Sequence, residues 1–280
     1  MRRALVSFCL LALSTGSAWA WGQEGHSIIA EIAQRRLTPQ AIAQIGRLLR
    51  PNHSLASIGS WADDVRDARP ETYNWHFVDI PIAEEHYAGG KHCRATDKGD
   101  CIVAELDRLK SELRCAPTDD AKREALKFAV HFVGDIHQPL HTVDEARGGN
   151  DISVEVRMAG GKTCRGGPCP VRSYRSNFHA LWDTGLIQAT TWSWGAYVER
   201  LEGGMLTEAA PGDSVGPVAA WAEETHKQAQ LAWNALPSTH LVDDGYYQTV
   251  LPILDTQLAV AGLRLARFLN EAYGSTGCAR

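Results

Sequence analysis

The chain has 280 residues, 44% of them hydrophobic, and its 28 basic and 33 acidic residues give a formal net charge of −5. This length and hydrophobic content suit a globular protein with one large domain or two smaller ones. The acidic balance argues against a nucleic-acid binder that relies on lysine and arginine alone, so bound cations would have to receive a polyanionic partner.

The first twenty residues are predicted to be a signal peptide that is removed from the mature protein. Arg2 and Arg3 form a positive start, residues 4–13 are apolar, and Ala18-Trp19-Ala20 is a typical cleavage site. Cleavage would leave Trp21 as a free N-terminus and, with two arginines lost, a formal charge of −7. Residues 21–280 contain no run approaching about eighteen apolar residues, so we expect one exported domain, periplasmic or secreted, without a membrane anchor.

Six cysteines remain after cleavage: Cys93, Cys101, Cys115, Cys164, Cys169 and Cys278. An even number in an exported chain predicts disulfides, although spacing alone does not fix the pairing. Cys164 and Cys169 flank a Gly-Gly-Pro loop and are predicted to form a local bridge. Cys278 is predicted to tie the C-terminal tail to an earlier loop, near Cys93.

Apolar periodicity and capping residues predict a mainly helical chain. Thr38 is a predicted N-cap with Pro39 at the first helical position, and the alternation of Ile152, Val154 and Val156 predicts a strand of a small β-hairpin. The predicted helices cover residues 27–37, 39–49, 60–69, 101–114, 120–137, 176–185, 193–201, 214–235 and 245–273, with an extended segment at 74–81 and a loop at 84–99. Neither an internal repeat nor a low-complexity linker interrupts them, so residues 21–280 should form a single domain.

The stretch from His131 to His141 concentrates three imidazoles and a carboxylate. His131 and Asp135 are four residues apart, so on a helix they point the same way, whereas His137 points to another face. Pro139 ends the helix, and His141 follows in a turn that can fold back toward the first two. The pattern indicates either a metal site of His131, Asp135 and His141 or a helix with ordinary hydrogen-bonded histidines. His137 is left out of the predicted site.

A second His-x-x-x-Asp pair occurs at His179 and Asp183. Like His131 and Asp135, it would present an imidazole and a carboxylate on one helix face, which suits borderline metals such as zinc. With His141 available, these side chains exceed the four ligands that one closed zinc site needs. The sequence therefore predicts more than one metal ion.

Several motifs together with these pairs resemble the S1/P1 nucleases, which are zinc-dependent single-strand nucleases. The motifs are Trp21-Gly22 with His26, Trp61-Ala62-Asp63, His76-Phe77-Val78-Asp79, the stretch from His131 to His141, and Asn177 to Asp183. The resemblance covers nearly the whole mature chain, from Trp21 to the segment ending at Ala266. It implies a mainly α single domain of the type shared with bacterial zinc phospholipases C.

The resemblance implies three zinc ions and assigns their ligands residue by residue. The first ion would be bound by Asp63, His76, His131 and Asp135, the second by His141, His179 and Asp183, and the third by the α-amine and carbonyl oxygen of Trp21, by His26 and by a bridging Asp135. Signal cleavage after Ala20 would free the amine that the third ion needs. Maturation and metal loading would then be coupled.

Three residues are predicted to be catalytic on the same resemblance: Arg66, Asp63 and Asp135. Arg66 would contact the phosphate and stabilise the transition state, and the two aspartates would act through the metal ions. Simpler alternatives stay open from the sequence alone. Asp63 could merely cap a helix, with Asp64 beside it as the ligand, and Arg66 could be a solvated helix residue.

A nucleobase pocket is also implied by the resemblance. Phe77 would stack on the base and Asp79 would hydrogen-bond its edge, although both could be ordinary strand residues. Asn150 would assist there or would only shape a turn after two glycines. The remaining histidines lie outside every motif and are predicted to be on the surface: His53, His86, His92, His226 and His240.

The activity implied is an exported endonuclease that cuts single-stranded DNA and RNA to 5′-phosphate products and also hydrolyses 3′-nucleotides, by hydroxide attack at the three-zinc centre. No protein partner is evident and we expect a monomer. Two alternatives are a zinc-dependent phospholipase C, which shares the fold, and a non-catalytic exported protein that stores or delivers zinc.

Overall fold

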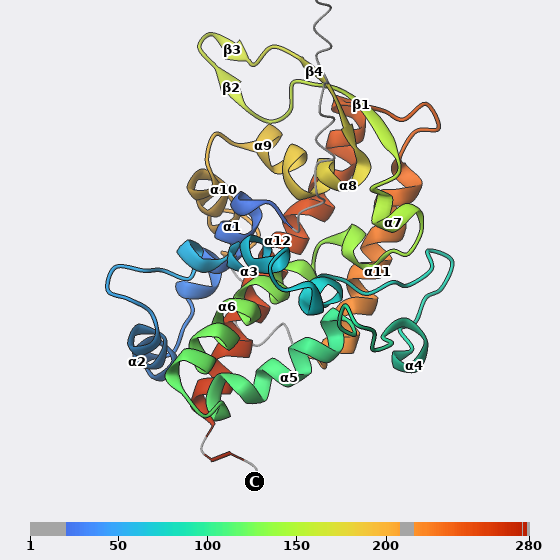
Figure 1. Cartoon of the computed structure of the whole chain (residues 1–280). Coiled ribbons are helices and arrows are strands. Elements are labelled where there is room, and N and C mark those ends of the chain that lie inside the picture. The colour runs from blue at the N-terminus through green and yellow to red at the C-terminus, as the bar shows by residue number, and fades with distance from the viewer. Residues whose placement is uncertain (1–20, 208–215, 276, 279–280) are drawn as a thin grey trace, which may run out of the picture.

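A computed structural model describes residues 21–207, 216–275 and 277–278, so the predicted signal peptide and the predicted helix start at Ser214 lie outside the described residues. Helices dominate, which confirms the mainly α prediction (Figure 1). The α-helices are α1 (Gln23–Gln34), α2 (Pro39–Leu48), α3 (Trp61–Arg66), α4 (Gly89–His92), α5 (Ile102–Cys115), α6 (Asp119–Asp135), α7 (Ala146–Gly149), α8 (Phe178–Ala180), α9 (Leu186–Thr190), α10 (Trp194–Glu202), α11 (Val218–Ala235) and α12 (Asp244–Gly274). Short 3₁₀ or π turns form η1 (Ala56–Ile58), η2 (Pro70–His76), η3 (Pro139–Thr142) and η4 (Leu181–Gly185).

A small sheet lies at one end of the molecule (Figure 1). Its strands are β4 (Arg172–Asn177), β1 (Ser153–Met158) and β5 (Leu241–Asp243), in that spatial order. β1 and β4 pair antiparallel from Ser153 opposite Asn177, which confirms the predicted hairpin, whereas β5 joins β1 in parallel. A second, two-stranded ribbon of β2 (Thr163–Cys164) and β3 (Gly167–Pro168) extends the hairpin connection.

Helix α12 is the centre of the core and runs from the sheet to the opposite end of the molecule (Figure 1). It contacts α1, α2, α5, α6 and α11. Its length and mean hydropathy of 1.2 over 18 residues would suffice to cross a membrane, but 67% of that window is buried inside the fold. Asp255 and Arg264, on the same helix, are buried and form ion pairs with Arg200 and Glu224. These features are typical of a central core helix.

The capping signals read from the sequence are confirmed where they are strongest. Thr38 accepts a hydrogen bond from the Ala41 amide at 3.3 Å, and Pro39 is the first residue of α2. Thr118, which was not predicted as a cap, accepts from the Ala121 amide at the start of α6, and α6 ends at Asp135, ahead of Pro139. In α2 and α6 a side chain therefore satisfies one of the unpaired amides of the first turn.

Three predicted segments are wrong in part, one of them the loop at 84–99, which contains the short helix α4. Residues 74–76 are not extended but complete the 3₁₀ helix η2, which begins at Pro70, where the fixed φ of proline suits the first helical position. The predicted helix over 176–185 starts two residues late, because Ser176 and Asn177 pair with β1, and it continues as α8 and then as the π turn η4.

Three disulfides are present in the described part of the chain, and one predicted pairing is wrong. Cys164–Cys169 closes the β2–β3 ribbon as expected. Cys278 is bonded to Cys115 and not to the neighbourhood of Cys93, which pairs with Cys101 instead. The tail reaches Cys115 because α5 ends there and packs along α12, a long-range contact that cysteine spacing does not encode.

Two histidines predicted on the surface are buried. His226 donates from Nδ1 to the carbonyl oxygen of Thr142 at 2.7 Å, and His92 accepts at Nδ1 from the Ala88 amide at 3.0 Å. His53, His86 and His240 are exposed, as predicted.

A glycine marks the tight crossing of α12 over α1. A methyl group added to Gly262 would lie 2.4 Å from Cγ2 of buried Ile32, whereas one added to Gly46, on exposed α2, would meet nothing within 4 Å. We expect Gly262→Ala to destabilise the protein by about 1–3 kcal/mol through overpacking. Gly46→Ala should be neutral or stabilise it by up to about 1 kcal/mol. Thermal unfolding measures both, and equal shifts would contradict the packing described.

Candidate metal centre

Eight of the predicted ligand side chains converge in one buried region, although they come from seven different elements. His131 and Asp135 lie on α6, His26 on α1, Asp63 on α3, His76 at the end of η2, His141 in η3, His179 on α8 and Asp183 in η4. All eight are at most 8% exposed. They form three sets that could each hold a metal ion, of which the first two share His131: His26, His131 and Asp135; Asp63, His76 and His131; and His141, His179 and Asp183.

The first cluster, as named here, is formed by Asp63, His76, His131 and Asp135. The His76 Nδ1, His131 Nε2 and Asp135 Oδ2 atoms are 3.0–3.1 Å from one another. Asp63 Oδ1 is 3.6 Å from both imidazole nitrogens. Ligands about 2.0–2.2 Å from a tetrahedral ion are roughly 3.3–3.6 Å apart, so the two 3.6 Å spacings match one divalent ion and the 3.0–3.1 Å spacings are a few tenths of an ångström tighter.

Three imidazoles are held with one nitrogen turned toward the clusters. His131 donates from Nδ1 to the Gly59 carbonyl oxygen at 2.7 Å, and His141 donates likewise to the His76 carbonyl oxygen at 2.8 Å. His179 donates to the Gly148 carbonyl oxygen at 2.7 Å. Because a carbonyl oxygen only accepts, Nδ1 carries the proton and Nε2 offers its lone pair, as in metal-bound histidines.

The third of these contacts depends on a glycine. Gly148 has a φ of +62°, and a Cβ at this position would lie 2.6 Å from the Leu140 carbonyl oxygen and 3.1 Å from Nδ1 of His179. Only glycine lets the backbone approach the imidazole this closely in a left-handed conformation. The sequence signalled this turn only by its paired glycines.

The second cluster is formed by His141, His179 and Asp183. Asp183 Oδ1 is 3.8 Å from His141 Nε2, and Oδ2 is 3.6 Å from His179 Nε2. Gln138 donates to Asp183 Oδ1 at 2.5 Å and fixes the carboxylate, a role that the sequence reasoning missed. The π turn η4 displaces Asp183 relative to a regular helix, and such turns are frequent at functional sites. Three protein ligands leave room for a further group on an ion bound there.

The side of Asp135 remote from the first cluster faces His26. Asp135 Oδ1 lies 3.3 Å from His26 Nε2, and the His26 ring stacks on that of His131 at 4.0 Å. Trp21 is fully buried beside them, because the adjacent Gly22 amide donates to the Asp183 carbonyl oxygen at 2.8 Å and the Gly22 carbonyl oxygen accepts from the His26 amide. Trp21 and Gly22, the first residues that the structure describes, are therefore packed against the clusters.

Burial governs the protonation of these groups. It lowers the pKa of His76 and of His179 to about 3, so both imidazoles are neutral near pH 7, the form that binds metals. It also raises the pKa of Asp63 to about 6. Burial also lowers the pKa of His131, but the negative charges of Asp135 and Asp63 outweigh burial and raise this pKa to about 9. A cation in the first cluster would replace the proton that His131 holds.

Several polar atoms in the clusters have no hydrogen bond within the described part of the chain. They include Asp63 Oδ1, Asp183 Oδ2 and both ring nitrogens of His26. Buried polar atoms are normally satisfied, and leaving several together is costly. A set of neutral imidazoles and carboxylates with their lone pairs directed inward fits divalent metal ions of the zinc type.

His137 does not belong to this region, as predicted. It is fully buried, donates from Nδ1 to the Val133 carbonyl oxygen at 2.7 Å and accepts at Nε2 from Arg264 at 3.0 Å. Burial and the charge of Arg264 lower its pKa to about 3, so it stays neutral. Its role is to join the end of α6 to α12.

Arg66 follows Asp63 by one helical turn on α3. Its guanidinium donates to the Tyr73 carbonyl oxygen at 3.2 Å and lies 4.1 Å from the centre of the Tyr73 ring. Burial has the largest effect on the pKa values of Asp63, His76 and Asp183. The positive charge of Arg66 has a smaller effect and lowers all three pKa values. A positive charge thus stands at the edge of the clusters.

Phe77 and Asp79, which follow His76 along the chain, line a cavity of about 300 Å³ together with Asn74, Arg94 and Asp144. Partial desolvation and the neighbouring Asp144 raise the pKa of Asp79 to about 6. Asn150 is not among the residues that line this cavity, and its amide donates to the Arg147 carbonyl oxygen at 2.8 Å. That bond is typical of a residue that shapes a turn.

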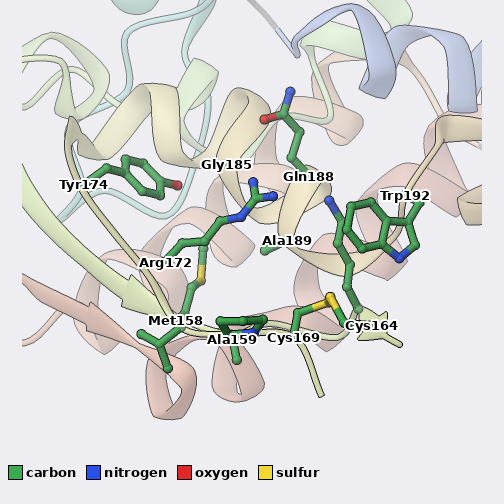
Figure 2. Close-up of a pocket in the computed structure, with 13 residues that line it drawn as sticks. Met158, Ala159, Cys164, Cys169, Arg172, Tyr174, Gly185, Gln188, Ala189 and Trp192 are labelled. Atoms are coloured by element: carbon green, nitrogen blue, oxygen red, sulfur yellow. A yellow bond between two sulfur atoms is a disulfide. The ribbon is translucent and has the colours of Figure 1, made fainter. Parts of the chain in front are cut away.

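A second cavity of about 350 Å³ lies at the base of the β2–β3 ribbon (Figure 2). The Cys164–Cys169 disulfide, Arg172, Tyr174 and Trp192 line it. None of the sequence-predicted site residues is among its lining residues in the described part of the chain.

Comparison with known proteins identifies the architecture. The model of a protein family described as S1/P1 Nuclease matches residues 21–274. The chain belongs to the S1/P1 nuclease family. Nuclease P1 of Penicillium citrinum is 30% identical over 91% of this chain and 98% of its own, and Endonuclease 2 of Arabidopsis thaliana is 29% identical over 91% of each. Nuclease S1 of Aspergillus oryzae is 26% identical over 95% of this chain and 96% of its own.

Membership of the S1/P1 nuclease family makes the chain a phosphodiesterase hydrolase. The match begins at Trp21, directly after the predicted cleavage site, and spans all the elements that carry the three clusters. The three disulfides indicate that the protein folds in an oxidising compartment outside the cytosol.

The metal content of two variants tests whether Asp135 binds metal ions and His137 does not. Asp135→Asn removes the charge that faces two clusters, so the variant should lose more than one bound divalent ion per chain. His137→Gln should keep its metal and lose about 1–3 kcal/mol of stability, because Arg264 loses a buried partner. Elemental analysis of dialysed protein and thermal unfolding give the two readouts. Equal metal loss in both variants would refute the geometry.

Proposed function

We propose that the mature chain is an exported zinc-dependent endonuclease that hydrolyses single-stranded DNA and RNA to 5′-phosphate products and also dephosphorylates 3′-nucleotides. The observation that carries this proposal is the first cluster, in which the nitrogens of His76 and His131 lie 3.0–3.1 Å from each other and from one oxygen of Asp135, and 3.6 Å from one oxygen of Asp63. Phe77 and Asp79, which follow His76 along the chain, line a cavity. Family membership supports the same class of reaction.

Three zinc ions are proposed, with ligand sets that the clusters support. Asp63, His76, His131 and Asp135 would hold the first, and His141, His179 and Asp183 the second. The third would be held by His26, Asp135 and the backbone amine and carbonyl oxygen of Trp21, once cleavage has freed the amine. The second carboxylate oxygen of Asp135 faces His26 at 3.3 Å, which suits a bridging role.

Zinc at these positions supplies Lewis acidity toward a phosphate group and activates water. The chain's own residues then position the substrate. Arg66 places a guanidinium where it can neutralise charge on the scissile phosphate. Loss of the 3′ oxygen as the leaving group gives the 5′-phosphate product.

Preference for single strands follows from the base pocket. A cavity of about 300 Å³ is large enough for a nucleobase, with Phe77 available for stacking and Asp79 for hydrogen bonding to the base edge. A base inside a duplex is stacked and paired on both sides, so it cannot enter without being extruded. Bound divalent ions would also offset the acidic charge of the mature chain and concentrate positive potential at the cleft.

One assay separates the proposed activity from its alternatives. The mature protein is incubated with single-stranded DNA, duplex DNA, RNA, a 3′-nucleotide and phosphatidylcholine, each with and without EDTA. We expect EDTA-sensitive release of 5′-nucleotides from both single strands, release of phosphate from the 3′-nucleotide, and slow cleavage of the duplex. Release of phosphocholine would support the phospholipase alternative, and no release from any substrate would support metal storage. Equal rates on duplex and single strand would refute the strand preference.

A further inference from the structure

Tyr73 is an exposed aromatic residue next to the proposed base pocket. It lies on η2, three residues before His76, and 42% of its surface is exposed. Its ring stands edge-on to Phe77, with 6.1 Å between ring centres and an angle of 84°. The ring therefore extends the aromatic surface of the pocket outward without being one of its lining residues.

Positive charges surround the Tyr73 ring. The Arg66 guanidinium is 4.1 Å and the Lys98 ammonium 5.3 Å from the ring centre. An aromatic face among cations is the combination with which proteins bind the bases and phosphates of a single strand.

This surface is held in place by its backbone. The amide of Asn74 donates to the Lys98 carbonyl oxygen at 2.9 Å, and the Asn74 side chain donates to Thr96 Oγ1 at 3.2 Å. The loop that carries Lys98 is closed by the Cys93–Cys101 disulfide. Tyr73 and Lys98 therefore keep a fixed relation to each other and to Phe77, so little conformational entropy is lost when they bind a ligand.

We infer that Tyr73 and Lys98 form a subsite for the nucleotide that flanks the one in the base pocket. The Tyr73 ring stacks on the flanking base, and the Lys98 ammonium pairs with the phosphate that joins it to the rest of the strand. This inference rests on the proposed nuclease function. It gives the site a reason to favour oligonucleotides, because a 3′-mononucleotide fills the base pocket and the metal clusters but has no flanking nucleotide.

The test compares KM for oligo(dA) with KM for 3′-AMP in the zinc-loaded mature protein. Tyr73→Ala should raise the ratio of the two KM values about tenfold, since stacking on an aromatic residue contributes about 1–3 kcal/mol per base. Tyr73→Phe keeps the ring and should restore the wild-type ratio. A change at Arg66 caused by the Tyr73 substitution would affect both substrates alike. The ratio of the two KM values therefore reports only on the flanking nucleotide.

Lys98 is tested through salt dependence. Lys98→Ala removes one phosphate contact, so the slope of log KM against log salt for oligo(dA) should fall by about 0.7, the value for a contact to single strands. Lys110→Ala is the matched control, because Lys110 is also an exposed lysine, on α5, and is paired with Glu271 of α12. Its slope should equal that of the wild type.

The outcomes separate this subsite from the proposed function. If the wild type cleaves both substrates and Tyr73→Ala changes both KM values by the same factor, the subsite is refuted and the nuclease stands. The same holds if Lys98→Ala and Lys110→Ala give equal slopes. If the wild type releases nothing from either substrate, the proposed function itself fails.

Discussion

A fully buried carboxylate, that of Asp135, is the constraint around which the centre is arranged. Its Oδ2 lies 3.0 Å from His76 Nδ1 and from His131 Nε2, while Oδ1 faces His26 at 3.3 Å. Although burial opposes its ionisation, the surrounding imidazoles, His131 first, hold its pKa well below the usual range. An unpaired buried charge costs several kcal/mol, so the three histidines and any bound cations must be present for this core to be stable.

The fold brings partners to the Asp135 carboxylate because several helices end or begin at the metal centre. Helix α6 ends at Asp135, η2 ends at His76, and η3 begins at Pro139 and carries His141. Where helices end, the backbone has free carbonyl oxygens, and those of Gly59, His76 and Gly148 orient the imidazoles. The long helix α12 contributes no ligand in the described structure, but it fixes the elements that do, including α6 through Arg264 and His137.

The sequence predicted those parts of the centre whose residues are close together along the chain. Two residues four apart must share a helix face, so the pairs His131–Asp135 and His179–Asp183 were accessible from spacing, as was the exclusion of His137. Asp63 and His76 join the centre through contacts more than 50 residues away along the chain, and only the resemblance to a family placed them there. The same limit explains the wrong pairing for Cys278 and the wrong placement of His226, whose partner Thr142 lies 84 residues away.

Anomalous diffraction at the zinc edge from crystals of the mature chain would test the account most directly. We predict three peaks: one among Asp63, His76, His131 and Oδ2 of Asp135; one between His26, the N-terminal amine of Trp21 and Oδ1 of Asp135; and one held by His141, His179 and Asp183. A single peak, or peaks that leave both oxygens of Asp135 without a metal ion, would contradict the account.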